Sequence, residues 1–212
     1  MEKYAKFAKA SYSMYSTGNK NRKQREDDAQ KIIPSGYIID SSSDSKRTVF
    51  INNDIKEVVI AHRGTVPTDV KDIAADVSIM VNISGSTARF KTAIQKDKKI
   101  KDKYKPLGYS IVIVGHSLGG KIAYESAKEN KLKAYLYNAA HGGSLTDAVV
   151  SKDKIKKAFG LSSKKEKKAD KNIKSYNTKL DPVSITARNR GGNNIEVKQK
   201  KGKDVHTIDN FL

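Results

Sequence analysis

Four β-branched apolar residues at 111–114, Ile-Val-Ile-Val, run directly into Gly-His-Ser-Leu-Gly at 115–119. Such an apolar run is typical of a strand that is buried on both faces. The five residues that follow match the pattern G-x-S-x-G, in which a serine stands on a sharp turn between a strand and a helix. The flanking glycines leave room for that turn. Ser117 is therefore the candidate nucleophile, and the backbone N–H of Leu118 is free to face an oxyanion.

Strands and helices alternate through the middle of the chain. The apolar pattern predicts buried strands at 58–61, 109–114 and 132–137, with helices at 68–83, about 87–103 and 121–129. This alternation favours a mostly parallel sheet that is flanked by helices. Together with the serine turn, it predicts an α/β fold of the α/β-hydrolase type, with residues 1–212 as a single domain.

The two ends of the chain carry weaker patterns. We expect an amphipathic helix at 1–16, a short helix at 26–31, paired strands at 37–39 and 48–51, and two last strands at 173–176 and 195–197.

Charge is the most unusual property of the composition. The formal net charge is +19, and the segment 152–174 holds ten lysines against three acidic residues. A surface of this kind attracts polyanions or an anionic membrane, but it says nothing about the fold. We interpret 152–174 as a lysine-rich surface insertion outside the core.

The absence of cysteine excludes disulfides and thiolate zinc sites. The sequence suggests neither a metal nor a cofactor. It shows no signal-like apolar stretch near Met1 and no window that would span a membrane, which favours an intracellular, cytoplasmic location.

A serine nucleophile needs a histidine base. In hydrolases of this fold the chain order is serine, acid, histidine, so only His141 and His206 qualify. His206 is the better candidate, because it alone leaves room for a strand that carries the acid. His141 remains the alternative.

The best candidate for the acid is Asp181, which follows a predicted strand and precedes a proline that fixes the turn. Asp170 and Asp204 are its rivals. A second oxyanion donor is expected at the end of the strand at 58–61, because parallel neighbours end at the same edge of a sheet. Thr65 offers both an N–H and a hydroxyl there.

These motifs together resemble a known family. The segments 59–65, 72–76, 114–120 and 181–183, followed by a late His206, are similar in content and order to the class 3 lipases, the fungal triacylglycerol lipase-like family. The resemblance covers roughly residues 45–206. It implies a triad of Ser117, Asp181 and His206, and an oxyanion hole formed by Thr65 and Leu118.

The resemblance also implies that Asp76 helps to hold the oxyanion residue, that no metal is needed, and that a helical lid lies somewhere in 66–90. The chain lacks cysteines, unlike many secreted members of the family, and it departs from the family in three further places. His62 stands where an apolar residue is usual, only six residues follow His206 to support its loop, and the lysine-rich segment 152–174 is not a family feature.

We therefore expect a hydrolase of lipid esters. Lysines of 152–174 would contact an anionic membrane, where each contributes about 1 kcal/mol. One alternative is a soluble esterase for small esters, and another is a polyanion-binding or membrane-binding protein on a hydrolase scaffold. A nucleic-acid partner is less favoured, because the lysine-rich segment is poor in the aromatic residues on which bases stack.

Overall fold

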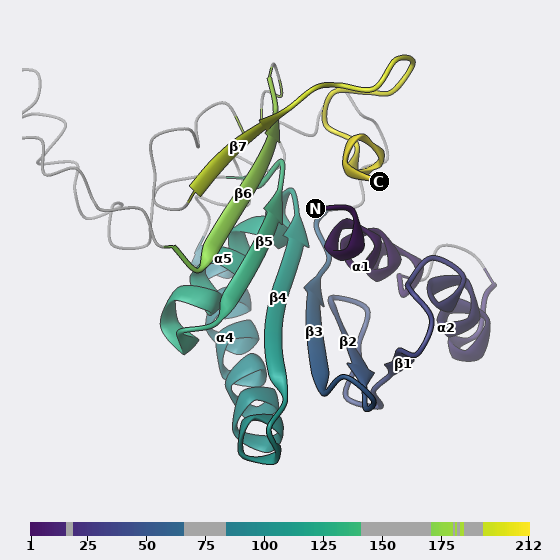
Figure 1. The fold of residues 1–212 in the computed structure, drawn as a ribbon, viewed down its shortest axis with the longest axis vertical. Coiled ribbons are helices and arrows are strands. Elements are labelled where there is room, and N and C mark those ends of the chain that lie inside the picture. The colour runs from purple at the N-terminus through teal and green to yellow at the C-terminus, as the bar shows by residue number, and fades with distance from the viewer. Residues whose placement is uncertain (16–18, 66–83, 141–170, 180, 182, 185–192) are drawn as a thin grey trace, which may run out of the picture.

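The computed structural model describes residues 1–15, 19–65, 84–140, 171–179, 181, 183–184 and 193–212. Within these residues seven strands form one sheet, in the order in which they occur along the chain (Figure 1). The strands are β1 (Ile38–Ile39), β2 (Arg47–Asn52), β3 (Glu57–His62), β4 (Ser110–His116), β5 (Lys133–Tyr137), β6 (Ile173–Thr178) and β7 (Asn193–Val197).

The sheet is mostly parallel, as the alternation of strands and helices predicts. β1 and β2 form an antiparallel edge with β3, and all pairings from β3 to β7 are parallel. His62 at the end of β3 pairs with Gly115 at the end of β4. The segment after β3 therefore emerges beside the turn that carries Ser117.

Helices cover both faces of the sheet (Figure 1). α4 (Ser84–Tyr104) and α5 (Leu118–Asn130) lie on one face, and α1 (Glu2–Ser13) lies on the other, with α2 (Arg22–Gln30) beside it. Two 3₁₀ helices, η2 (Lys105–Leu107) and η4 (Ile208–Phe211), complete the described elements. The fold is thus the flanked α/β sheet expected from the sequence.

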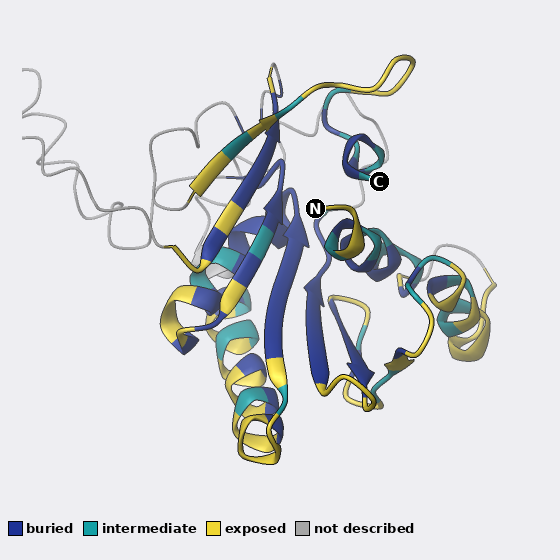
Figure 2. Cartoon of the chain, viewed as in Figure 1, coloured by how far each residue is buried: buried dark blue, intermediate teal, exposed yellow. Residues whose placement is uncertain are grey.

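Alternation along the central strands divides the core into two layers. In β3, Val59 and Ala61 pack towards α1, whereas Val58 and Ile60 pack towards α4 and α5. Both layers exclude water, and the central strands are buried along almost their whole length (Figure 2). Burial on both faces explains why these strands are continuous apolar runs in the sequence.

A buried polar cluster joins three elements on the α4 side. The carboxylate of Asp97, which is fully buried on α4, accepts hydrogen bonds from Arg47 Nη1 (3.2 Å), His62 Nε2 (2.7 Å) and Ser126 Oγ (2.6 Å). A buried carboxylate is tolerated only when it is paired in this way. His62 is therefore a structural partner of Asp97, which accounts for a histidine where the resemblance implies an apolar residue.

The boundaries of several elements differ from the sequence-based ones. The first helix ends at Ser13 rather than at residue 16. The second helix begins earlier, at Arg22, because the side chain of Asn21 accepts from the backbone N–H of Gln24, and the side chain of Gln24 accepts from the backbone N–H of Asn21.

Three expectations concern residues that the structure does not describe. The predicted helix at 68–83 and most of the lid region 66–90 lie outside the described residues. The described part of the lid region belongs to α4, which begins at Ser84. Most of the lysine-rich segment also lies outside the described residues. β6 begins at Ile173, where the last-but-one strand is predicted, so the final two residues of this segment belong to the sheet.

Among the described helices, none combines the length and apolar character needed to cross a bilayer.

Candidate active site

The turn between β4 and α5 holds Ser117 in a strained backbone conformation. Its φ of 57° and ψ of −128° are rare for any residue other than glycine. The surrounding backbone is packed too closely for side chains. A Cβ on Gly115 would lie 2.2 Å from the carbonyl oxygen of Gly119, and a Cβ on Gly119 would lie 2.1 Å from that of His62. The G-x-S-x-G pattern therefore forms the sharp turn that the sequence predicts.

The start of α5 supplies one side of a candidate oxyanion hole. Leu118 is the first residue of this helix, so its backbone N–H has no acceptor within the helix. A helix N-terminus also favours negative charge. From the other side, Gly64 approaches so closely that a Cβ there would lie 3.2 Å from Cβ of Ser117. Thr65 is the next residue and is half-buried, whereas Asp76 lies outside the described residues.

Asp181 and His206 come together at the same edge of the sheet. His206 Nδ1 lies 2.7 Å from Oδ1 of Asp181, which is fully buried, and Oδ2 of Asp181 accepts from the backbone N–H of Ser184 (2.8 Å). Burial alone would raise the pKa of Asp181, but the hydrogen bond and charge of His206, with the N–H of Ser184, lower it below its usual range. An ionised carboxylate only accepts hydrogen bonds, so Nδ1 carries a proton, and when the imidazole is neutral this is its only ring proton.

The other ring nitrogen of His206 is then the basic one. Nε2 is buried and makes no hydrogen bond in the described structure. The ring of His206 lies 4.8 Å, centroid to centroid, from that of His116, the neighbour of Ser117. Ser117 and His206 share no hydrogen bond here, as is common in free enzymes before substrate aligns the groups. The arrangement leaves an unprotonated nitrogen buried beside the serine turn.

The rivals for these roles are placed differently or not described. His141 and Asp170 lie outside the described residues. Asp204 accepts the backbone N–H of His206 through Oδ1 (2.8 Å), so it shapes the loop and does not orient the ring. No group of three or more His, Asp or Glu side chains in the described part of the chain is placed to hold a metal ion.

A hydrogen-bonded chain that the sequence did not reveal runs behind the site. His116 Nε2 lies 2.6 Å from the carbonyl oxygen of His206, and His116 Nδ1 lies 2.9 Å from the hydroxyl of Tyr12 on α1. A carbonyl only accepts, so Nε2 carries the proton and Nδ1 accepts from Tyr12. The same hydroxyl lies only 2.4 Å from where a Cβ on Gly64 would be. The chain thus links α1, the serine turn and the backbone of the His206 loop.

The hydrogen bonds of His116 lead to a prediction about the stability of the protein in acid. Burial, with the nearby charge of His206, lowers the pKa of His116 to about 3. An unfolded histidine titrates near 6.5, so between those values the unfolded state binds a proton that the folded state refuses. We expect the stability supplied by neutral His116 to fall by roughly 1.4 kcal/mol per pH unit below pH 6.5. Urea unfolding of the wild type and of His116→Gln at pH 7, 6 and 5 measures the difference.

The variant lacks this titration, so its free energy of unfolding should fall less steeply with acidification. Equal slopes for the two proteins would mean that His116 is protonated in the fold, and would contradict the assigned hydrogen-bond directions.

Comparison with known proteins places this geometry in a family. Residues 3–208 match the family described as Phospholipase-like, Tle-like phospholipase domain. No curated protein matches the sequence.

Solved structures show the same fold at low identity. A mutant form of MDLA from Penicillium cyclopium has a TM-score of 0.53 and 19% identity, covering 98% of this chain and 82% of that one. Lipase II from Rhizopus niveus has a TM-score of 0.51 and 16% identity, covering 96% of this chain and 80% of the other. The resemblance to lipases is thereby confirmed for the fold. With nearly its whole length matched, the chain belongs to the Tle-like phospholipase domain family and is an ester hydrolase of the lipase and phospholipase type.

Proposed function

We propose that the protein hydrolyses lipid carboxylic esters through a Ser117–His206–Asp181 triad and an acyl-enzyme. The observation that carries this proposal is the 2.7 Å contact between His206 Nδ1 and the buried carboxylate of Asp181, with Nε2 left unpartnered. That contact fixes the tautomer in which the free nitrogen accepts a proton. If His206 had only a structural role, we would expect its buried Nε2 to have a hydrogen-bond partner as well.

The reaction follows from these positions. Ser117 Oγ attacks the ester carbonyl while its proton passes to His206 Nε2, and Asp181 stabilises the imidazolium that results. The oxyanion faces the N–H of Leu118 and the donors of Thr65. The C–O bond to the alcohol then breaks, and the alcohol takes the proton from His206. Water repeats these steps on the acyl-enzyme, releasing the acid and restoring Ser117.

Two observations favour lipid over small soluble esters. The family is named for phospholipases, and the similar structure from Rhizopus niveus is a lipase. The net charge of +19 would draw the protein to an anionic membrane, where lipid esters are concentrated. We propose that lysines of 152–174 make this contact. A nucleic-acid partner is not part of the proposal.

The proposed function is tested with p-nitrophenyl esters of increasing chain length, with and without vesicles that contain anionic phospholipid. We expect long acyl chains to be preferred and vesicles to raise the rate. An activity confined to short chains and indifferent to vesicles would instead identify a small-ester esterase. A fluorophosphonate probe should label Ser117, as read by peptide mass spectrometry, and labelling at another serine would overturn the assignment of the nucleophile.

A further inference from the structure

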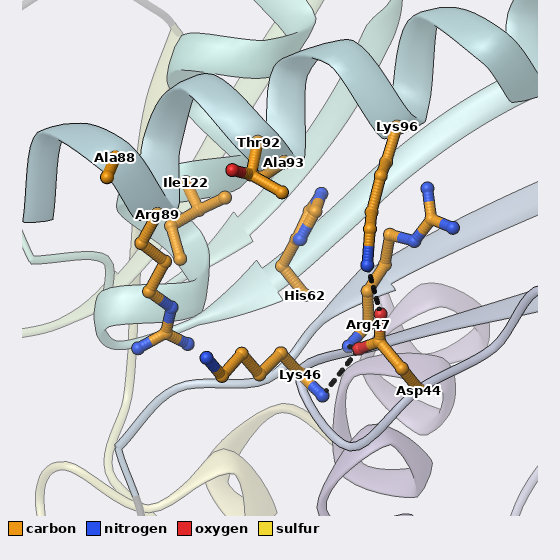
Figure 3. Close-up of a pocket in the computed structure, with 10 residues that line it drawn as sticks. All are labelled: Asp44, Lys46, Arg47, His62, Ala88, Arg89, Thr92, Ala93, Lys96 and Ile122. Carbon is orange, nitrogen blue, oxygen red and sulfur yellow. Dashed lines mark hydrogen bonds and ion pairs between the residues drawn. The ribbon is translucent and has the colours of Figure 1, made fainter.

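A pocket of about 360 Å³ lies on the α4 side of the sheet, beside the end of β3 (Figure 3). Its volume is at the lower end of the range for small-molecule sites. Four of its lining side chains are cationic, and one, Asp44, is a carboxylate. The cations are Lys46, Arg47, Arg89 and Lys96. Such an excess of positive charge in a concave site favours an anion.

Two of the four cations already have carboxylate partners. Lys96 Nζ lies 2.7 Å from Oδ2 of Asp44, and Arg47 is paired with the buried Asp97. Oδ1 of Asp44 accepts hydrogen bonds from the backbone N–H groups of Lys46 and Arg47. Within the described residues, neither Lys46 nor Arg89 forms an ion pair with a carboxylate. In the described part of the chain, these two are the lining cations whose charge no carboxylate offsets, so they are the ones that an anion would stabilise most.

Arg89 and Lys46 converge on one side of the pocket. In Figure 3 the side chain of Lys46 extends towards the guanidinium of Arg89. Arg89 Nη2 donates to the carbonyl oxygen of Arg63 (3.1 Å), while its Nε–H is buried and has no acceptor in the described structure. Burial and the charge of Arg63 both lower the pKa of Arg89. Converging cations with an unmet donor are stabilised when an anion with several acceptor oxygens binds between them.

We propose that Lys46 and Arg89 bind the phosphate of a glycerophospholipid substrate, a subsite that rests on the ester hydrolysis proposed above. Arg89 contacts the backbone of Arg63, and the next residue, Gly64, packs against Ser117. The subsite therefore adjoins the segment after β3 that leads to Thr65, the second candidate oxyanion donor. In a glycerophospholipid the phosphate and the carboxylic esters share one glycerol, so holding the phosphate here positions an ester beside Ser117. The planar guanidinium supplies paired donors, and the lysine adds a point charge.

The first test compares two soluble substrates, dihexanoyl phosphatidylcholine below its micelle concentration and dihexanoylglycerol, which lacks the phosphate. Monomeric substrates remove any effect of attraction to a membrane. We expect Lys46→Gln to lower the ratio of kcat/KM for the phospholipid over the diacylglycerol by about tenfold, equivalent to about 1.4 kcal/mol. Lys99→Gln, which removes an exposed positive charge from α4 outside the pocket, is the matched control. Equal ratios in the two variants would overturn the subsite while leaving ester hydrolysis intact.

The second test measures binding without turnover. Dihexanoyl phosphatidylcholine is titrated into Ser117→Ala, with and without Lys46→Gln, by calorimetry, and we expect Lys46→Gln to weaken binding about tenfold. If no ester is hydrolysed but this loss is seen, the phosphate site stands and the proposed reaction fails. Inorganic phosphate is the comparison ligand. If it binds in a Lys46-dependent way while the phospholipid does not, the pocket is a site for free anions and the proposal is wrong.

Discussion

Replacing Ser117 by alanine is expected to lower kcat for ester hydrolysis by about 10⁶-fold, to the rate that binding and the oxyanion donors alone support. Without Oγ no acyl-enzyme forms, and His206 has no proton to accept. The measurement is the hydrolysis of a soluble p-nitrophenyl ester at enzyme concentrations high enough to detect the residual rate. The same preparation should fail to react with a fluorophosphonate.

A second variant separates the loss of chemistry from any loss of structure. Ser117 has a φ of 57°, and alanine keeps the Cβ that makes this conformation costly. Ser117→Gly removes that strain, so we expect it to be as inactive as the alanine variant but more stable, by roughly 1 kcal/mol. If either variant folds normally and retains wild-type activity, Ser117 is not the nucleophile, and the family resemblance does not extend to the reaction.

The parts of the site that the sequence predicts rest on a local motif, on a general property of parallel sheets, or on chain order. The serine turn is contained in the motif at 115–119, because a strand, a sharp turn and a helix follow one another without a break. The position of the segment after β3 followed from a general property of parallel sheets, since β3 and β4 end at the same edge. Asp181 and His206 followed from chain order and from the strand that separates them from Ser117.

The parts that were missed depend on contacts between distant polar residues. Tyr12 belongs to the apolar face of a helix by its spacing, and nothing in that spacing indicates that its hydroxyl meets His116, 104 residues away. The cluster around Asp97 is similar, because periodicity marks a residue as buried or exposed but does not name its partner. Partners of buried polar groups are set by tertiary packing.

The last residues of the sequence also make tertiary contacts that their sequence pattern does not indicate. Six residues after His206 suggested little support for its loop, and that expectation is wrong. Phe211 is fully buried and packs on Tyr137 at 5.1 Å between ring centroids, and the side-chain amide of Asn210 donates to the carbonyl oxygens of Asp204 and Val205. The aromatic ring and the amide both follow His206 and help to hold its loop, together with contacts from earlier in the chain such as that of His116, so the number of following residues is a poor guide.

Replacing Asp181 by asparagine is expected to lower kcat by about 10⁴-fold with little change in fold. The structure gives a specific reason. The backbone N–H of Ser184 donates to Oδ2, so an asparagine would keep its amide oxygen there and turn its NH₂ group towards His206 Nδ1. Nδ1 must then accept a hydrogen bond, which moves the ring proton to Nε2. In that tautomer His206 cannot take the proton of Ser117.

Asp204→Asn is the matched control, because this residue also contacts His206 but through the backbone N–H. The amide oxygen of an asparagine accepts that N–H as well as a carboxylate does, so the loss of kcat should stay within about tenfold, the factor that corresponds to 1.4 kcal/mol. Steady-state kinetics of both variants on one soluble ester decide between the two carboxylates. A larger loss for Asp204→Asn than for Asp181→Asn would assign the role of the acid to Asp204. It would also overturn the argument that the buried contact of Asp181 sets the tautomer of His206.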